Sequence, residues 1–174
     1  VAPRSMTDRV HGVDNEAQHL VLLCENETGY RNLSYLVSRG FLDGFYVRPR
    51  IDLALLRQHS EGLIALSACL AGAIPRRLRA NDYEGAKQYA LELSEIFGED
   101  HFYLELQDHG LEEQREVNRG IVRLARETGL PLVVTNDAHY LTREDSYIQD
   151  VLLCIQTGKT VEDPNRMRFE TQEF

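Results

Sequence analysis

The chain has 174 residues, with 28 Asp and Glu against 19 Lys and Arg, and so a formal net charge of −9. This length suits a single domain with a core, and a composition of 43% apolar and 27% charged residues is globular rather than disordered. No apolar run approaches the ~20 residues of a membrane span, so we expect no membrane partner. The acidic balance argues against broad, nonspecific coating of nucleic acid, but a local DNA site built around metal ions stays open.

The three cysteines lie far apart, at positions 24, 69 and 154, and form no CxxC pair. An odd and scattered set argues against a disulfide framework and for a reducing compartment, which predicts a cytoplasmic protein.

Short apolar runs alternate with segments of helical periodicity along most of the chain. Residues 1–17 are polar and aperiodic, which predicts a loop or arm. Four strands are predicted, at 18–24, 62–67, 101–106 and 131–135. Helices are predicted between and after them, over 26–40, 53–59, 68–79 with a break at Pro75, 82–98, 111–128 and from 142 to about 157. This alternation predicts an α/β fold with parallel strands and outer helices.

Several residues mark the expected ends of these helices. Asn26 and Asp82 are placed to cap two helices, and Gly40 is placed to end the first. Thr142 and Asp145 have the spacing of a capping box. Because four strands are few for a closed barrel, we expect an open sheet or an incomplete barrel, with an edge that a homodimer would cover.

Polar groups of the metal-ligand type follow three of the predicted strands, and one histidine begins the first. Functional residues of parallel sheets gather after the carboxyl ends of the strands. Cys, His and Asp together suit zinc or a similar metal, which acidifies bound water and stabilises charge on a phosphoryl oxygen. The candidates are His19, Cys69, Asp108, His109, Asp137 and His139.

Each candidate also has a structural interpretation. A lone cysteine after a strand is more often a small buried apolar residue, and His19 is more often a hydrogen-bonded core histidine. Asp108 and Asp137 are in loops, where Asp commonly caps or turns the chain. There is no GxGxxG and no GxxxxGK[ST], so nucleotide-cofactor and P-loop hypotheses are poor.

Long segments of the chain resemble one family. They include HLVLLCENETGYRNL, DGFYVRPRID, HSEGLIALSACLAGAIP, FYLELQDHGLEEQREVN, LPLVVTNDAHYLTREDS and VLLCIQTGKTVEDPNRMRF. In order and over essentially all 174 residues, they are similar to the polymerase-and-histidinol-phosphatase (PHP) domain of the alpha subunits of bacterial DNA polymerase III.

The resemblance implies a fold and a place in a larger protein. The fold is a distorted (β/α)7 barrel, of which residues 1–174 would be the C-terminal portion, with 158–174 as the exit toward the polymerase module. The partners implied are DNA and the other domains and subunits of the replicative polymerase. The polymerase module, with its Mg²⁺, lies outside the chain.

The resemblance also implies a metal site. His19, Cys69, Asp137 and His139 fall on family ligands for Zn²⁺ or Mn²⁺. Asp108 and His109 match a family segment that is not a ligand motif, so they are candidates only for residues that lie behind the ligands. The intact family site resembles a phosphoesterase with 3′–5′ proofreading exonuclease activity. The family's opening HxH motif and its other early ligands have no counterpart in these 174 residues, so we expect this chain alone to be inactive.

Two alternatives stay open. In some family members the site has decayed, and the domain supports the polymerase or docks a separate proofreading subunit. A free-standing phosphatase is the other, and the tail TGKTVEDPNRMRF argues against it because it resembles the exit toward the polymerase module.

Overall fold

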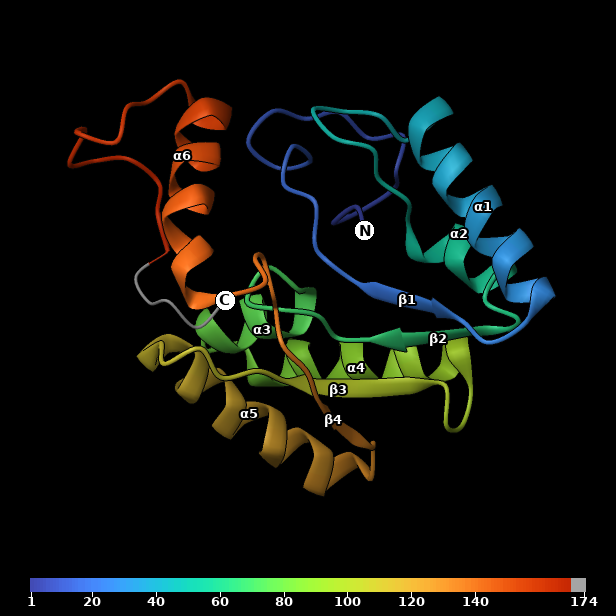
Figure 1. Cartoon of the computed structure of the whole chain (residues 1–174). Coiled ribbons are helices and arrows are strands. Elements are labelled where there is room, and N and C mark those ends of the chain that lie inside the picture. The colour runs from blue at the N-terminus through green and yellow to red at the C-terminus, as the bar shows by residue number, and fades with distance from the viewer. Residues whose placement is uncertain (170–174) are drawn as a thin grey trace.

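The computed structural model describes residues 1–169 and has the predicted alternation of strands and helices. Residues 170–174 of the expected exit segment lie outside the described residues. None of the helices in the described part is both long and apolar enough to cross a bilayer. The elements, shown in Figure 1, are β1 (Val21–Cys24), α1 (Glu27–Leu42), α2 (Leu53–Gln58), β2 (Leu63–Leu66), α3 (Ala73–Arg79), α4 (Tyr83–Phe97), β3 (Phe102–Leu106), α5 (Glu112–Thr128), β4 (Leu132–Val134), the 3-10 turn η1 (Arg143–Asp145) and α6 (Ser146–Thr157).

The four strands form one open sheet in the order β1-β2-β3-β4. Strands β2, β3 and β4 are parallel, as expected, but β1 runs antiparallel to β2, with Val21 opposite Leu66 and Cys24 opposite Leu63. The expectation that all four strands are parallel is therefore wrong for β1. The chain leaves β1 and, after α1 and α2, returns to the same end of that strand, where the Glu25 amide donates to Gly62 O at 2.9 Å. The β2–β3 connection also contains two helices, α3 and α4, but it crosses to the other end of the strands, so β2 and β3 are parallel.

Two glycines allow this tight return. Gly29, in the first turn of α1, lies so close to the loop before β2 that a Cβ on it would be 1.8 Å from Gly62 O. Gly62 itself has a φ of 72°, in the left-handed region that favours glycine. The start of α1 is thus held against the start of β2 by backbone contact that no larger residue permits.

The helix ends follow the sequence signals in most places. The side chains of Asn26 and Asp82 accept the amides of Gly29 and Gly85, and both bonds of the Thr142–Asp145 capping box are present. Gly40 does not end α1, which continues to Leu42.

Pro75 does not break a helix either. Helix α3 begins at Ala73, so Pro75 lies in its first turn, where the missing amide of proline has no intrahelical partner to lose.

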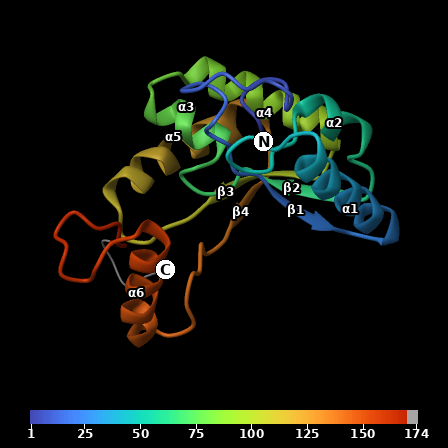
Figure 2. The ribbon, with the colours of Figure 1, turned by 90° about the horizontal axis from the view of Figure 1, so that it is seen from above.

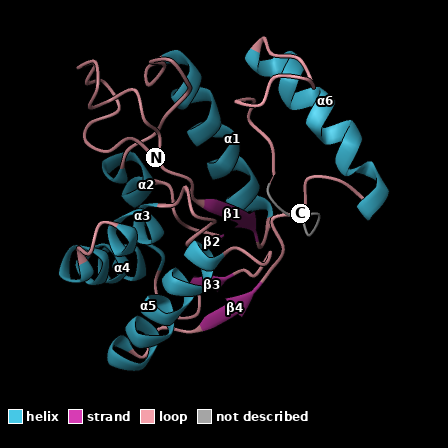
Figure 3. Ribbon diagram, turned by 90° about the vertical axis from the view of Figure 1, so that its left-hand side faces the viewer, coloured by secondary structure: helices cyan, strands magenta, loops and turns pink. Residues whose placement is uncertain are grey.

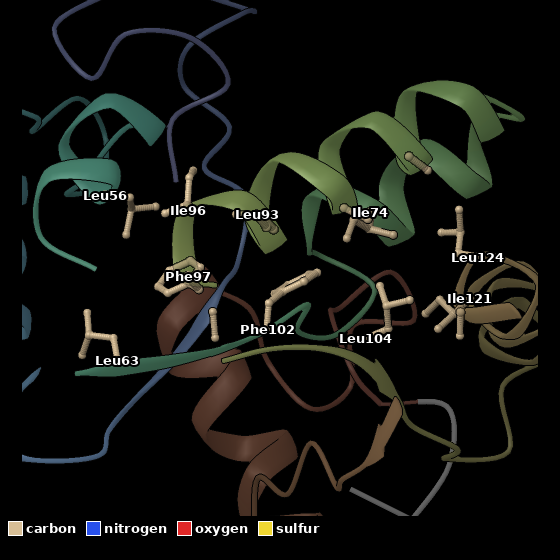
Figure 4. Packing of buried hydrophobic residues seen from close by; sticks show 14 of the residues in the cluster. Leu56, Leu63, Ile74, Leu93, Ile96, Phe97, Phe102, Leu104, Ile121 and Leu124 are labelled. Atoms are coloured by element: carbon tan, nitrogen blue, oxygen red, sulfur yellow. The ribbon is translucent and has the colours of Figure 1, made fainter. Parts of the chain in front are cut away.

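The main core lies between the sheet and helices α3, α4 and α5, which cover one of its faces (Figures 1 and 2). Alternate residues of β3, Phe102 and Leu104, are 1% and 0% exposed and point toward these helices. Figure 4 shows them packed against Leu93 of α4, Ile74 of α3 and others. The opposite face of β3 is therefore left for polar residues.

The polar segment 1–17 has no helix or strand but is firmly attached. Arg50, only 2% exposed, donates hydrogen bonds to Asp14 O at 2.6 Å and to Met6 O and Asp8 O at 2.9 Å. Its Nε donates to Gly44 O at 3.1 Å. One buried guanidinium thus satisfies carbonyls that no secondary structure pairs, and holds the arm in place.

Helix α6 lies on the opposite side of the sheet from α4 and stands apart from it (Figures 2 and 3). Its residues Ile148, Leu152 and Ile155 are more than half exposed. The chain reaches α6 through residues 135–142, which leave the end of β4.

We predict that Gly29→Ala destabilises the protein by about 1–3 kcal/mol, because the new methyl group collides with Gly62 O. Gly40→Ala, on the same helix, is the matched control. Its nearest neighbour is Ile51 Cγ2 at 3.4 Å, so it should be neutral or stabilise by up to ~1 kcal/mol. Urea unfolding of both variants measures the difference, and equal stability of the two would contradict the close approach.

Candidate functional site

The antiparallel direction of β1 places its beginning beside the carboxyl ends of the other three strands. The His19 amide donates to Ala71 O at 3.1 Å, and His19 forms a bridge with Gly72 in the loop after β2. At these strand ends the chain encloses an open cavity of about 690 Å³. Its polar lining includes His19, Cys69, Glu105, Gln107 and Asp137.

His19 and Cys69 are in direct contact across the cavity. Cys69 Sγ lies 3.6 Å from His19 Nδ1. Burial raises the pKa of the half-buried Cys69 thiol, and the negative charge of Asp137 raises it further. Desolvation lowers the pKa of His19, as does the positive charge of Arg76. Both shifts favour neutral side chains, so the pair holds a nitrogen and a sulfur donor without a charge of its own.

Asp137 approaches this pair, but His139 does not join it. Asp137 lines the same cavity and acts electrostatically on both His19 and Cys69. His139 is exposed and outside the cavity lining. Its Nδ1 lies 2.6 Å from Asp137 O, and its ring packs against Phe169 with 4.8 Å between centroids.

The two residues after β3 have different surroundings. Asp108 is exposed, and its Oδ1 accepts the Gly110 amide at 2.9 Å, which is the turn-forming role typical of loop Asp. His109 is fully buried, and its Nε2 accepts the backbone amide of Asp137 at 3.1 Å. Gln114 Oε1 lies 3.2 Å from His109 Nδ1, so the ring proton is on Nδ1 and faces Gln114. His109 therefore supports the loop that carries Asp137.

Sequence reasoning missed two buried polar residues: Glu105, on the face of β3 that points away from the core helices, and Gln107, directly after the strand. Glu105 and Gln107 are 4% and 6% exposed, and both line the cavity. The signal was present in the alternation of 101–106, because Tyr103, Glu105 and Gln107 occupy one face of the strand and apolar residues the other. A charged residue on a strand this deep in the sheet needs hydrogen-bond partners, which marks it as more than a surface residue.

The types of donor atom in the cavity match those that zinc prefers, but their arrangement does not form a complete zinc site. Imidazole nitrogen, thiol sulfur and carboxylate oxygen are all zinc ligands. Among residues 1–169, however, no three His, Cys, Asp or Glu side chains are arranged to hold a metal ion. The described residues thus fit part of a metal shell.

Comparison with known proteins identifies relatives across the whole chain. A family model described as the PHP domain matches residues 5–109. DNA polymerase III subunit alpha of Treponema pallidum is 49% identical over 100% of the chain, and that of Thermus aquaticus is 46% identical over the same share. The Borreliella burgdorferi protein of the same name is 51% identical over 90% of the chain. The chain spans only 14–15% of the length of these relatives.

We predict that His109→Phe destabilises the protein by about 1–3 kcal/mol, because it leaves the Asp137 amide without its acceptor. The control is His11→Phe, at an exposed position in the arm, which should change stability little. Urea unfolding measures both. An unchanged midpoint for His109→Phe would show that this hydrogen bond does not hold the Asp137 loop.

Proposed function

The chain belongs to the PHP domain family, and from that premise we propose that it is part of the alpha subunit of a bacterial replicative DNA polymerase. The observation that carries the proposal is identity of 46–51% to proteins of that name over 90–100% of the chain. DNA and the other domains and subunits of the polymerase are then its partners. Residues 1–17 form an arm of the PHP domain, and the segment from residue 158 leads toward the polymerase module.

Within that protein, we propose that the cavity at the sheet edge is a metal site for phosphodiester hydrolysis, with 3′–5′ exonuclease activity. His19, Cys69 and Asp137 would hold Zn²⁺ or Mn²⁺, and His139 would join them through a change of its ring position. The contact between His19 Nδ1 and Cys69 Sγ and the placement of Asp137 on the same cavity support this assignment. The remaining donors would come from outside residues 1–169.

A bound ion would supply an activated water and a positive charge opposite a phosphoryl oxygen. The residues of this chain do the rest. His19, with its lowered pKa, presents a neutral nitrogen lone pair, and Asp137 provides negative charge beside Cys69. Arg48, which lines the same cavity, is placed to attract a phosphate group.

A second candidate function is a scaffold without chemistry. It is favoured by the incomplete donor arrangement among residues 1–169 and by the position of His139 outside the cavity. In that case the domain would support the polymerase or dock a proofreading subunit, and the metal ligands would be remnants.

We further propose that the sheet is part of a distorted (β/α)7 barrel. Both edge strands carry exposed apolar side chains, Leu23 on β1 at 48% and Val134 on β4 at 78%. Edges of this kind are normally covered. Further barrel strands would cover them in the full protein, and a homodimer through one edge is the alternative.

We predict that the full-length protein binds Zn²⁺ and that Cys69→Ser or His19→Gln lowers the affinity by more than ~100-fold, because each removes a donor. Cys24→Ser is the matched control, since Cys24 is exposed on β1 and lies outside the cavity lining. Competition with a chromophoric chelator measures the affinities. Equal affinity of Cys69→Ser and Cys24→Ser would remove Cys69 from the site.

We predict that the full-length protein digests a 3′-mismatched primer when Zn²⁺ or Mn²⁺ is supplied. Asp137→Asn should abolish this digestion and leave DNA synthesis intact, because the polymerase carboxylates lie elsewhere. Asp108→Asn is the control, as Asp108 is exposed in a turn. The 174-residue chain alone should give no digestion. No digestion by the full-length wild type would favour the scaffold, and digestion by the short chain would contradict the need for outside donors.

A further inference from the structure

We propose that Glu105 is a positioning residue that fixes where Cys69 and Asp137 lie relative to each other. The inference rests on the proposed metal site. Cys69 and Asp137 follow β2 and β4, which are not neighbours in the sheet because β3 lies between them. Glu105 is on that middle strand, with its side chain at the cavity wall.

One carboxyl group joins both loops. Glu105 Oε2 accepts the backbone amide of Ala68 at 2.9 Å, and Ala68 directly precedes Cys69. Glu105 Oε1 accepts the hydroxyl of Thr135, two residues before Asp137. A shift of either loop would therefore stretch a hydrogen bond to the same side chain.

The loop that carries Cys69 needs this support. Ala68 has a φ of 65°, in the left-handed region that residues with a Cβ seldom adopt. Its amide points at Glu105, and the Glu105 amide in turn donates to Ser67 Oγ at 2.8 Å. These two bonds hold the turn that directs Cys69 toward His19.

Burial makes these hydrogen bonds indispensable to Glu105. Glu105 is only 4% exposed, and it takes part in none of the ion pairs formed within residues 1–169. Its third partner is the Gln107 amide nitrogen at 3.0 Å. A carboxyl group that is buried without a charged partner costs free energy unless its oxygens accept hydrogen bonds. The three donors therefore fix the position of the Glu105 side chain.

Gln107 connects this network to the cavity. Its side-chain Nε2 donates hydrogen bonds to Glu105 Oε1 at 3.0 Å and to Thr135 Oγ1 at 3.3 Å. Its Oε1 is buried and has no hydrogen-bond partner within the described chain. An unpaired acceptor on the wall of a polar cavity suits a donor inside it, such as a water bound to a metal ion.

The test compares Glu105→Gln with Thr135→Val and Thr135→Ser in the full-length protein. Glutamine keeps the size of Glu105 but replaces one acceptor oxygen with a donor, so it cannot accept all three bonds. Valine removes the Thr135 hydroxyl, and serine restores it. Glu92→Gln, at a partly exposed position on α4 where Glu92 pairs with Arg57, is the matched control, and Ile121→Val, in the core, controls for lost stability.

Two readouts are used. The first is the binding of Co²⁺ as a zinc substitute, followed through the thiolate absorption band of a Cys69 ligand. Glu105→Gln and Thr135→Val should lower the affinity by about 10–100-fold and change the band, as substitutions behind metal ligands do, while Thr135→Ser retains both. The second is amide hydrogen exchange without metal, which should accelerate at 68–69 and 136–137 in Glu105→Gln and only at 136–137 in Thr135→Val.

The outcomes separate this inference from the proposed function. If the wild type gives no thiolate band, the metal site fails, and the exchange rates still decide whether Glu105 couples the loops. If the wild type binds Co²⁺ and Glu105→Gln binds it equally well, the positioning role is overturned and the site stands. Exchange that accelerates throughout the domain, as in Ile121→Val, would also overturn it by showing a general loss of stability.

Discussion

The direction of β1 is the constraint on which the candidate site depends. Because β1 runs antiparallel to β2, the end that carries His19 lies beside the end of β2 that leads to Cys69. If β1 were parallel to β2, His19 would lie at the opposite end of the strands, roughly 10 Å or more from Cys69 at ~3.3 Å per strand residue. The contact between Gly29 and Gly62 is where the chain makes the return that this direction needs.

Local sequence signals predicted the elements well because they act locally. Asn26, Asp82 and Thr142 cap their helices as expected, since a cap depends on residues two or three positions away. The direction of β1 was not predictable in this way, because it depends on which end of β1 the chain returns to after α1 and α2, and no local residue pattern determines that. Pro75 was misjudged for a related reason, since its effect depends on where the helix starts.

The candidate site was predictable only in its chemistry. The rule that functional residues follow strands selected Cys69 and Asp137, and the structure places both on one cavity with His19. It did not select Glu105 or Arg50, whose side chains form hydrogen bonds with distant segments of the chain. Hydrogen bonds of that kind leave no periodic pattern in the sequence, and only a charged residue in an otherwise apolar strand hints at them.

The attachment of the arm by Arg50 also bears on the order of folding. The carbonyls that Arg50 binds in the arm precede it by 36 to 44 residues. During synthesis the arm therefore leaves the ribosome before Arg50 has been added to the chain, and residues 1–17 form no helix or strand of their own. Contacts of this separation form late because the intervening chain must first be ordered. His19, which follows the arm, is held by Ala71 in the loop after β2, so its place in the site also depends on a segment that is synthesised much later.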